Sequence, residues 1–151
     1  MRRTIQTTSL LALVLLLFSC SSRGLNTELT SCVYPDSNRT AAPSFICDQQ
    51  LDGYPITALR SLPENDQSAS EASATLLNEQ IAEWSALWSG DWFTDALQRQ
   101  QAVLFLHNYL HEHARVIRSR TSPKNTLWLL IGVDASLDEV RALTEAALSA
   151  G

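Results

Sequence analysis

The chain has 151 residues, of which 45% are hydrophobic and 18% are charged, and its net charge is −5 at neutral pH. This length is sufficient for one domain with a single core. The balance is acidic, and it becomes −7 if the two arginines near the start are removed with a leader. An acidic domain lacks the basic surface that nucleic-acid binding usually requires, so the composition argues against a nucleic-acid partner.

The start of the chain has the pattern of a bacterial secretory signal. Two arginines precede an apolar run from Leu10 to Phe18, which is shorter than the roughly 20 residues of a membrane span. A serine then stands directly before Cys20, as in lipoprotein signals. We therefore expect a signal peptide over 1–19 and a mature chain that begins at a lipidated Cys20. An ordinary cleaved signal peptide or a short N-terminal helix is the alternative.

Lipidation of Cys20 would also determine where the protein is held. Ser21 and Ser22 follow the cysteine, where an aspartate would resemble an inner-membrane retention signal. We therefore expect the outer membrane as the location, with the domain facing the periplasm. The membrane would be a partner through the acyl chains, each buried CH₂ contributing about 0.8 kcal/mol. Residues 20–43 are rich in Ser, Thr and Asn, which is typical of a flexible tether.

Two further cysteines, Cys32 and Cys47, remain as an even pair if Cys20 carries lipid. In an exported protein such a pair favours a disulfide. The bridge would close a loop of about 15 residues and contribute up to about 3 kcal/mol. The enclosed segment has neither helical nor strand periodicity, so the bridge would order it. The alternative is a reactive or metal-binding pair, but the chain has no CxxC spacing and no third ligand nearby to support it.

From residue 44 to residue 151 the sequence predicts a single α+β domain. A strand is expected over 54–62, and a capping box at Ser68–Glu71 opens a helix whose apolar stripe ends at Ser89-Gly90. A second helix is expected over 93–115. Residues 115–121 and 127–133 then form an antiparallel hairpin, and a capping box at 136–139 opens a last helix.

The second strand of this hairpin is almost continuously apolar. That pattern is typical of a central strand buried on both faces. The element order is strand, helix, helix, strand, strand, helix. We expect helices packed on one face of a small antiparallel sheet.

The order of these segments resembles a family of small bacterial lipoproteins, typified by the twenty-kilodalton membrane-associated lipoprotein. The segments that carry the resemblance are Pro43-Ser44-Phe45-Ile46, Gly53-Tyr54-Pro55-Ile56-Thr57-Ala58-Leu59, the alanine-rich stretch 69–84, Val116-Ile117 and Trp128-Leu129-Leu130-Ile131-Gly132-Val133. The resemblance implies an outer-membrane location and a role in envelope structure or motility, and it carries over no catalytic residue. This chain departs from the pattern at Leu59-Arg60-Ser61, where the family has a Val-Gly-Ser-like end, and in its long second helix.

The candidates for chemistry are few. His107 and His111 lie four residues apart on one predicted helix, so both imidazoles can face one way and chelate a metal. Zinc needs three or four ligands, and no His-Glu-x-x-His pattern supplies them. Histidines at a packing interface are the favoured interpretation, and we expect no metal or other cofactor. The chain also lacks a Gly-x-Ser-x-Gly elbow and a phosphate-binding glycine loop, which argues against an enzyme.

Four large aromatic residues lie within ten positions. Trp84 and Trp88 belong to the apolar stripe of the first helix, so we expect them in the core. Trp92 and Phe93 follow the glycine break, and we expect them to be exposed as a partner-binding pair.

The leading hypothesis is a non-enzymatic, lipid-anchored envelope protein with a structural, assembly or protein-interaction role. Its partner would be an unknown envelope protein or a second copy of the chain. The alternative is a periplasmic ligand- or metal-binding module. A concave pocket with convergent polar groups would favour that alternative, whereas an exposed apolar patch or a free strand edge would favour the first hypothesis.

Overall fold

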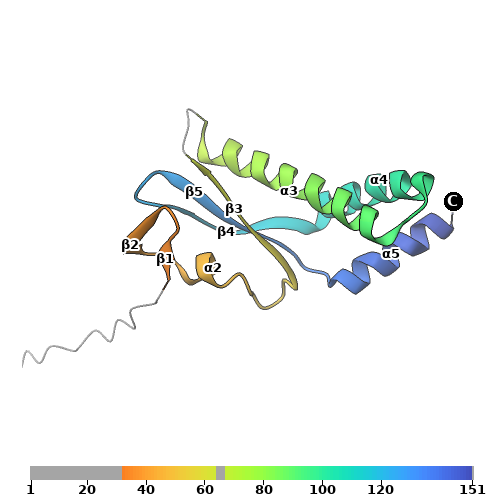
Figure 1. The fold of residues 1–151 in the computed structure, drawn as a ribbon, viewed down its shortest axis with the longest axis horizontal. Coiled ribbons are helices and arrows are strands. Elements are labelled where there is room, and N and C mark those ends of the chain that lie inside the picture. The colour runs from red at the N-terminus through yellow and green to blue at the C-terminus, as the bar shows by residue number, and fades with distance from the viewer. Residues whose placement is uncertain (1–31, 64–66, 151) are drawn as a thin grey trace, which may run out of the picture.

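The computed structural model describes residues 32–63 and 67–150, and these form an α+β fold (Figure 1). A three-stranded antiparallel sheet has the order β3, β5, β4. The strands are β3 (Ile56–Pro63), β4 (Ala114–Thr121) and β5 (Thr126–Val133), and the helices are α3 (Ala69–Trp92), α4 (Ala96–His113) and α5 (Leu137–Ser149). Helix α3 lies across one face of this sheet, α4 packs against α3, and α5 packs against α4 at the end of the sheet. The predicted class and the predicted order of these six elements are confirmed.

The central strand β5 is buried on both of its faces. Leu129 and Ile131 point toward the helices and are completely buried in the main core. Successive strand side chains point to opposite faces, so Trp128 and Leu130 point the other way. Leu130 is also completely buried, and Trp128 packs against a second, smaller apolar cluster. The apolar run therefore predicts the position of β5 correctly.

Helix α3 begins at a complete capping box. The Ser68 side chain accepts a hydrogen bond from the Glu71 N–H, and the Glu71 carboxylate accepts one from the Ser68 N–H at 3.0 Å. These two bonds satisfy backbone donors that a helix start would otherwise leave open. They also hold the pKa of Glu71 below its usual value, with the bond from the Ser68 backbone as the largest cause.

The helix continues beyond the position where the sequence analysis placed its end. It passes through Gly90 and stops at Trp92. Trp84, Trp88 and Trp92 stack one turn apart, with ring centres separated by 5.6 Å and 5.7 Å. A glycine inside a helix costs about 1 kcal/mol relative to alanine. Stacking of Trp92 on Trp88 and its packing against the core offset that cost.

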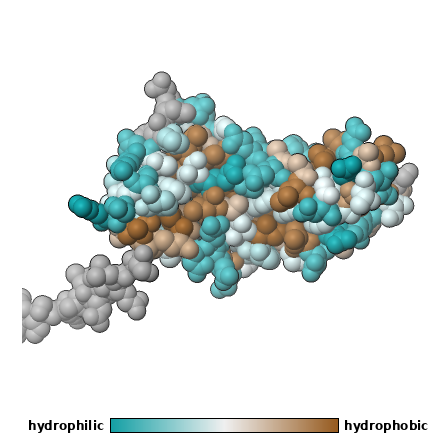
Figure 2. Space-filling model, in the orientation of Figure 1, coloured by the Kyte–Doolittle hydropathy of each residue, from teal (hydrophilic) through white to brown (hydrophobic). Residues whose placement is uncertain are grey.

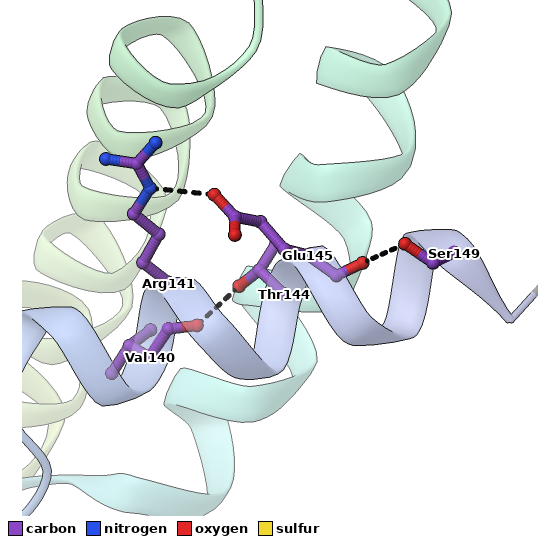
Figure 3. Close-up of polar contacts among 5 residues, drawn as sticks. All are labelled: Val140, Arg141, Thr144, Glu145 and Ser149. Carbon is purple, nitrogen blue, oxygen red and sulfur yellow. Dashed lines mark hydrogen bonds and ion pairs between the residues drawn. The ribbon is translucent and has the colours of Figure 1, made fainter.

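Helices α4 and α5 complete the layer. Asp95 caps α4 by accepting a hydrogen bond from the Gln98 N–H at 2.9 Å, and Ser136 caps α5 in the same way through the Glu139 N–H. Within α5, the buried Thr144 hydroxyl donates to the Val140 carbonyl at 2.8 Å, so this core-facing helix side contains no unsatisfied hydroxyl (Figure 3). The ion pairs and hydrogen bonds of Arg141, Glu145 and Ser149 lie along the exposed sides.

The opposite face of the sheet is covered by the N-terminal segment. This segment contains β1 (Val33–Tyr34), β2 (Ser37–Ala41) and the short helix α2 (Ser44–Cys47). Its buried side chains pack against Leu59 and Trp128 of the sheet; they are Cys32, Tyr34, Ala42 and Ile46. The assignment of residues up to 43 to a tether is therefore wrong for 33–41. The periodicity of this segment does not predict its folded structure, because that structure depends on contacts with a sheet that is distant in the sequence.

Two connections hold the N-terminal segment in place. The predicted disulfide between Cys32 and Cys47 is confirmed, with Cα atoms 5.6 Å apart, and it joins the start of the segment to α2. In addition, the Ser122 hydroxyl donates to the Asp36 carboxylate, which links the β1–β2 turn to the β4–β5 turn. The bond from Ser122 is the main reason that the pKa of Asp36 lies below its usual value.

Substitution of the central tryptophan tests the stacked core. We expect Trp88→Ala to lower the free energy of unfolding by about 3 to 5 kcal/mol, because it removes a large buried ring from between two others. Leu87→Ala on the same helix is the control, since Leu87 is 54% exposed, and it should change stability by less than about 0.5 kcal/mol. Urea unfolding followed by circular dichroism measures both. Equal losses in the two variants would contradict the packing described here.

Reduction of the disulfide tests the N-terminal segment. We expect stability to fall by up to about 3 kcal/mol, because the unfolded chain is no longer constrained by the closed loop. Amide hydrogen exchange should increase over residues 33–47 more than in β5, since the small cluster under the sheet depends on this link. Unchanged exchange over 33–47 after complete reduction would show that the apolar contacts alone hold the segment.

Candidate interaction surface

The predicted partner-binding pair is not exposed as expected. Trp92 is partly buried, because it stacks on Trp88 and packs against the main core. Phe93 is also partly buried and forms the C-terminal cap of α3, where its N–H donates to the Ser89 carbonyl at 3.1 Å. The expectation of a free aromatic pair fails because the helix does not break at Gly90. These two residues complete the end of α3.

Helix α4 instead presents apolar residues on two opposite sides. Ala102, Leu106 and Leu110 are completely buried and face the core. Leu97 and Leu104 are 64% and 63% exposed. At 3.6 residues per turn, Leu104 lies about 200° around the helix from Leu106. A surface helix normally has a single apolar face, so the outward leucines are not explained by packing within the domain.

The outward side of α4 is also poor in charge. From Ala96 to His111 the only charged residue is Arg99, which lies on the side of Leu106 rather than that of Leu104. We call the exposed residues on the outward side the α4 outer stripe; they are Leu97, Gln100, Gln101, Leu104 and Asn108. Depletion of charge together with exposed apolar side chains is typical of the centre of a protein interface.

A shallow groove lies beside the α4 outer stripe. Its volume is about 200 Å³, and it is lined by Gln101 and Phe105 of α4 and by Ala147 and Leu148 of α5. Apolar residues also reach the surface in Figure 2, both at the helical end of the molecule and over the N-terminal segment. The groove therefore extends the apolar character of α4 toward α5.

The side of α4 that faces α5 is filled by a second row of rings. Phe105 stacks on Tyr109, and Tyr109 stacks on His113 with ring centres 4.2 Å apart. His113 Nδ1 lies 3.3 Å from the Asp134 carboxylate. Burial raises the pKa of Tyr109, and the negative charges of Glu139 and Asp134 add to this shift. His113 is therefore engaged in the contact between α4 and the start of α5.

The structure brings the other two histidines together. The ring centres of His107 and His111 are 4.6 Å apart, with an angle of 64° between the ring planes. Within 32–63 and 67–150, no group of three or more His, Cys, Asp or Glu side chains is arranged to hold a metal ion. The predicted pairing on one helix side is thus present, and it consists of two imidazoles.

Two concave sites on the surface bear on the alternative hypothesis of a ligand-binding module. A depression of about 450 Å³ lies along the loop from Gln50 to Thr57, and the Thr57 hydroxyl there donates to the Gln49 carbonyl. A smaller cavity of about 40 Å³ lies between Leu62, Ala72 and Leu127. The loop depression is open to solvent, its Thr57 hydroxyl is already hydrogen-bonded, and its other polar lining residues are Gln50, Asp52 and Tyr54.

No family model, curated protein or solved structure matches this chain. No helix in the described part of the chain is long and apolar enough to cross a membrane. The predicted signal peptide over 1–19 and the predicted lipidation site Cys20 lie outside the described residues.

The sequence analysis missed the α4 outer stripe, although the signal for it was present. The prediction of a helix over 93–115 did not assign its leucines, Leu97, Leu104, Leu106 and Leu110, to separate sides of that helix. Projection at 100° per residue separates the first two from the last two and places them on opposite sides of the helix. The absence of acidic residues between Ala96 and His111 is a second signal that is visible without coordinates.

Proposed function

We propose that this protein is a non-enzymatic, lipid-anchored envelope protein of the outer membrane, which associates with a second copy through the α4 outer stripe. The observation that carries this proposal is the pair of exposed leucines, Leu97 and Leu104, opposite the core-facing side of α4. The lipoprotein-like start of the chain supports the anchor. The disulfide between Cys32 and Cys47 supports an oxidising compartment.

The spacing of the two leucines favours a second copy as the partner. Leu97 and Leu104 are seven residues apart, or about 10.5 Å along the helix. When two copies of α4 pack antiparallel around a two-fold axis near Gln100 and Gln101, each Leu97 meets the partner's Leu104. The contact is self-complementary, as cyclic dimers require. It brings no like charges together, because Arg99 lies on the other side of the helix.

Membrane anchoring makes a small contact sufficient. One pair of helices buries less surface than the roughly 1,200 to 2,000 Å² of a standard stable interface, so association in free solution should be weak. Two lipid anchors would hold the domains in one plane at a high effective concentration. We therefore infer that the dimer forms mainly on membranes, where the anchor at Cys20 and the α4 outer stripe act together.

A cysteine placed at the proposed two-fold axis tests the dimer. We expect Gln101→Cys in the full lipidated chain to form a covalent dimer under mild oxidation in native membranes, because the two copies of this position face each other. Adding Leu97→Gln and Leu104→Gln should abolish the covalent dimer without lowering thermal stability, since both leucines are exposed. Non-reducing electrophoresis and thermal unfolding measure the two effects.

Two control variants make this test specific. Leu143→Gln on α5, at a residue that is 44% exposed, should leave the covalent dimer unchanged. A Gln50→Cys variant, placed on the distant loop, should give no comparable dimer. A covalent adduct of Gln101→Cys with a different envelope protein would overturn the second copy as the partner. It would leave the α4 outer stripe as the site of contact.

Substitution of the acceptor cysteine tests the anchor. We expect Cys20→Ser to abolish labelling with radioactive palmitate and to leave the precursor uncut, because the thiol is the proposed acyl acceptor. Labelling, cleavage and membrane fractionation measure this result. If the serine variant were still cleaved at the same bond and still sedimented with membranes, the protein would not be a lipoprotein of this kind.

A further inference from the structure

His107 and His111 form a separate feature of α4. They lie one turn apart on one side of the helix, adjacent to Leu104 of the α4 outer stripe and away from the side that contacts α5. His107 is partly buried and His111 is exposed, so a small ion has access from solvent. None of the ion pairs found in the described part of the chain involves either residue.

The distance between the two rings is that of neighbouring metal ligands. At a metal–nitrogen distance of about 2.0 to 2.1 Å, each imidazole centre lies about 3.2 Å from the metal, so two ligands at about 90° have ring centres about 4.5 Å apart. The observed separation of 4.6 Å agrees with this value. A tetrahedral angle would require about 5.2 Å. The separation of the ring centres therefore permits two ligands at about 90°, the angle that a tetragonal ion requires.

We propose that His107 and His111 form a two-imidazole site for a divalent transition-metal ion, and that Cu²⁺ is the ion it holds most tightly. Cu²⁺ prefers square-planar or tetragonal surroundings, accepts imidazole nitrogen, and stands at the top of the affinity order for divalent ions. Zinc prefers three or four protein ligands in tetrahedral geometry. The described part of the chain offers no third His, Cys, Asp or Glu at this place. Water fills the remaining positions around the copper ion.

Both proposed ligands come from one copy, so the site does not require the proposed dimer, although His111 lies seven residues after Leu104 and therefore on the same side of α4. His113 belongs to the same helix but lies on the opposite side, where it stacks on Tyr109 and contacts Asp134. It therefore provides a matched control at a residue of the same type. His107→Gln and His111→Gln each remove one proposed ligand and keep a polar side chain of similar size.

The experiment is a titration of the full mature chain, with its disulfide intact, with CuCl₂ in a non-chelating buffer. Calorimetry gives the affinity, and electron paramagnetic resonance gives the number of nitrogen ligands. We expect one Cu²⁺ per chain with two nitrogen ligands. His107→Gln and His111→Gln should each weaken binding roughly 100-fold, because the second imidazole otherwise binds intramolecularly. His113→Gln should change neither quantity.

Three results would overturn the site. The first is equal Cu²⁺ affinity in the wild type and the two glutamine variants, with α4 intact by far-ultraviolet circular dichroism. The second is a spectrum with a single nitrogen ligand in the wild type. The third is tighter binding of Zn²⁺ than of Cu²⁺ in the same buffer, which would contradict the geometry argued from the ring separation. His111 is exposed, so we expect His111→Gln to fold normally. A loss of Cu²⁺ binding in this variant would therefore report loss of the ligand and not loss of the fold.

Discussion

Burial of β5 on both faces is the constraint on which the rest of the structure depends. Leu129 and Ile131 hold the helical layer on one side, while Leu130 and Trp128 hold the N-terminal segment on the other. Both apolar clusters therefore include side chains of this strand. Gly132 also belongs to β5, and a methyl group there would meet the side chain of Ile117, the residue left unpaired by the register shift in β4.

The start of the described chain at Cys32 and the proposed contact surface belong to different layers of the fold. The chain enters the described domain at Cys32, under the sheet, where the disulfide and the bond between Ser122 and Asp36 fix its direction. Helix α4 lies in the other layer (Figure 1). The N-terminal segment therefore does not cover the α4 outer stripe, which is exposed in the described part of the chain.

Periodicity predicted the elements that depend on local pattern, and it failed where distant contacts decide. The apolar run of β5 and the capping box at Ser68 gave correct elements, because burial on both faces and N-terminal capping leave direct marks in sequence. The β1–β2 hairpin left none, since its order comes from the sheet beneath it and from a bond spanning 86 positions. The assignment at Gly90 was wrong for a different reason: it gave the helix-breaking tendency of glycine more weight than the stacking of Trp92 on Trp88, which is a local contact four residues apart within α3.

Helix α4 shows how closely structural and functional demands can share one element. Viewed down its axis, it has two neighbouring inward rows, and on the opposite side an outward row and an imidazole pair that lie only about 20° to 60° from each other. Leu106 faces the core, Phe105 begins the aromatic row toward α5, Leu104 points outward, and His107 begins the imidazole pair. A helix with so few charged residues gains little from surface ion pairs, so its stability comes from packing on two of these rows. Leu97 and Leu104 are exposed and contribute little to packing within the domain, which is the basis of the proposed contact between copies, and the pairing of His107 with His111 is the basis of the proposed copper site.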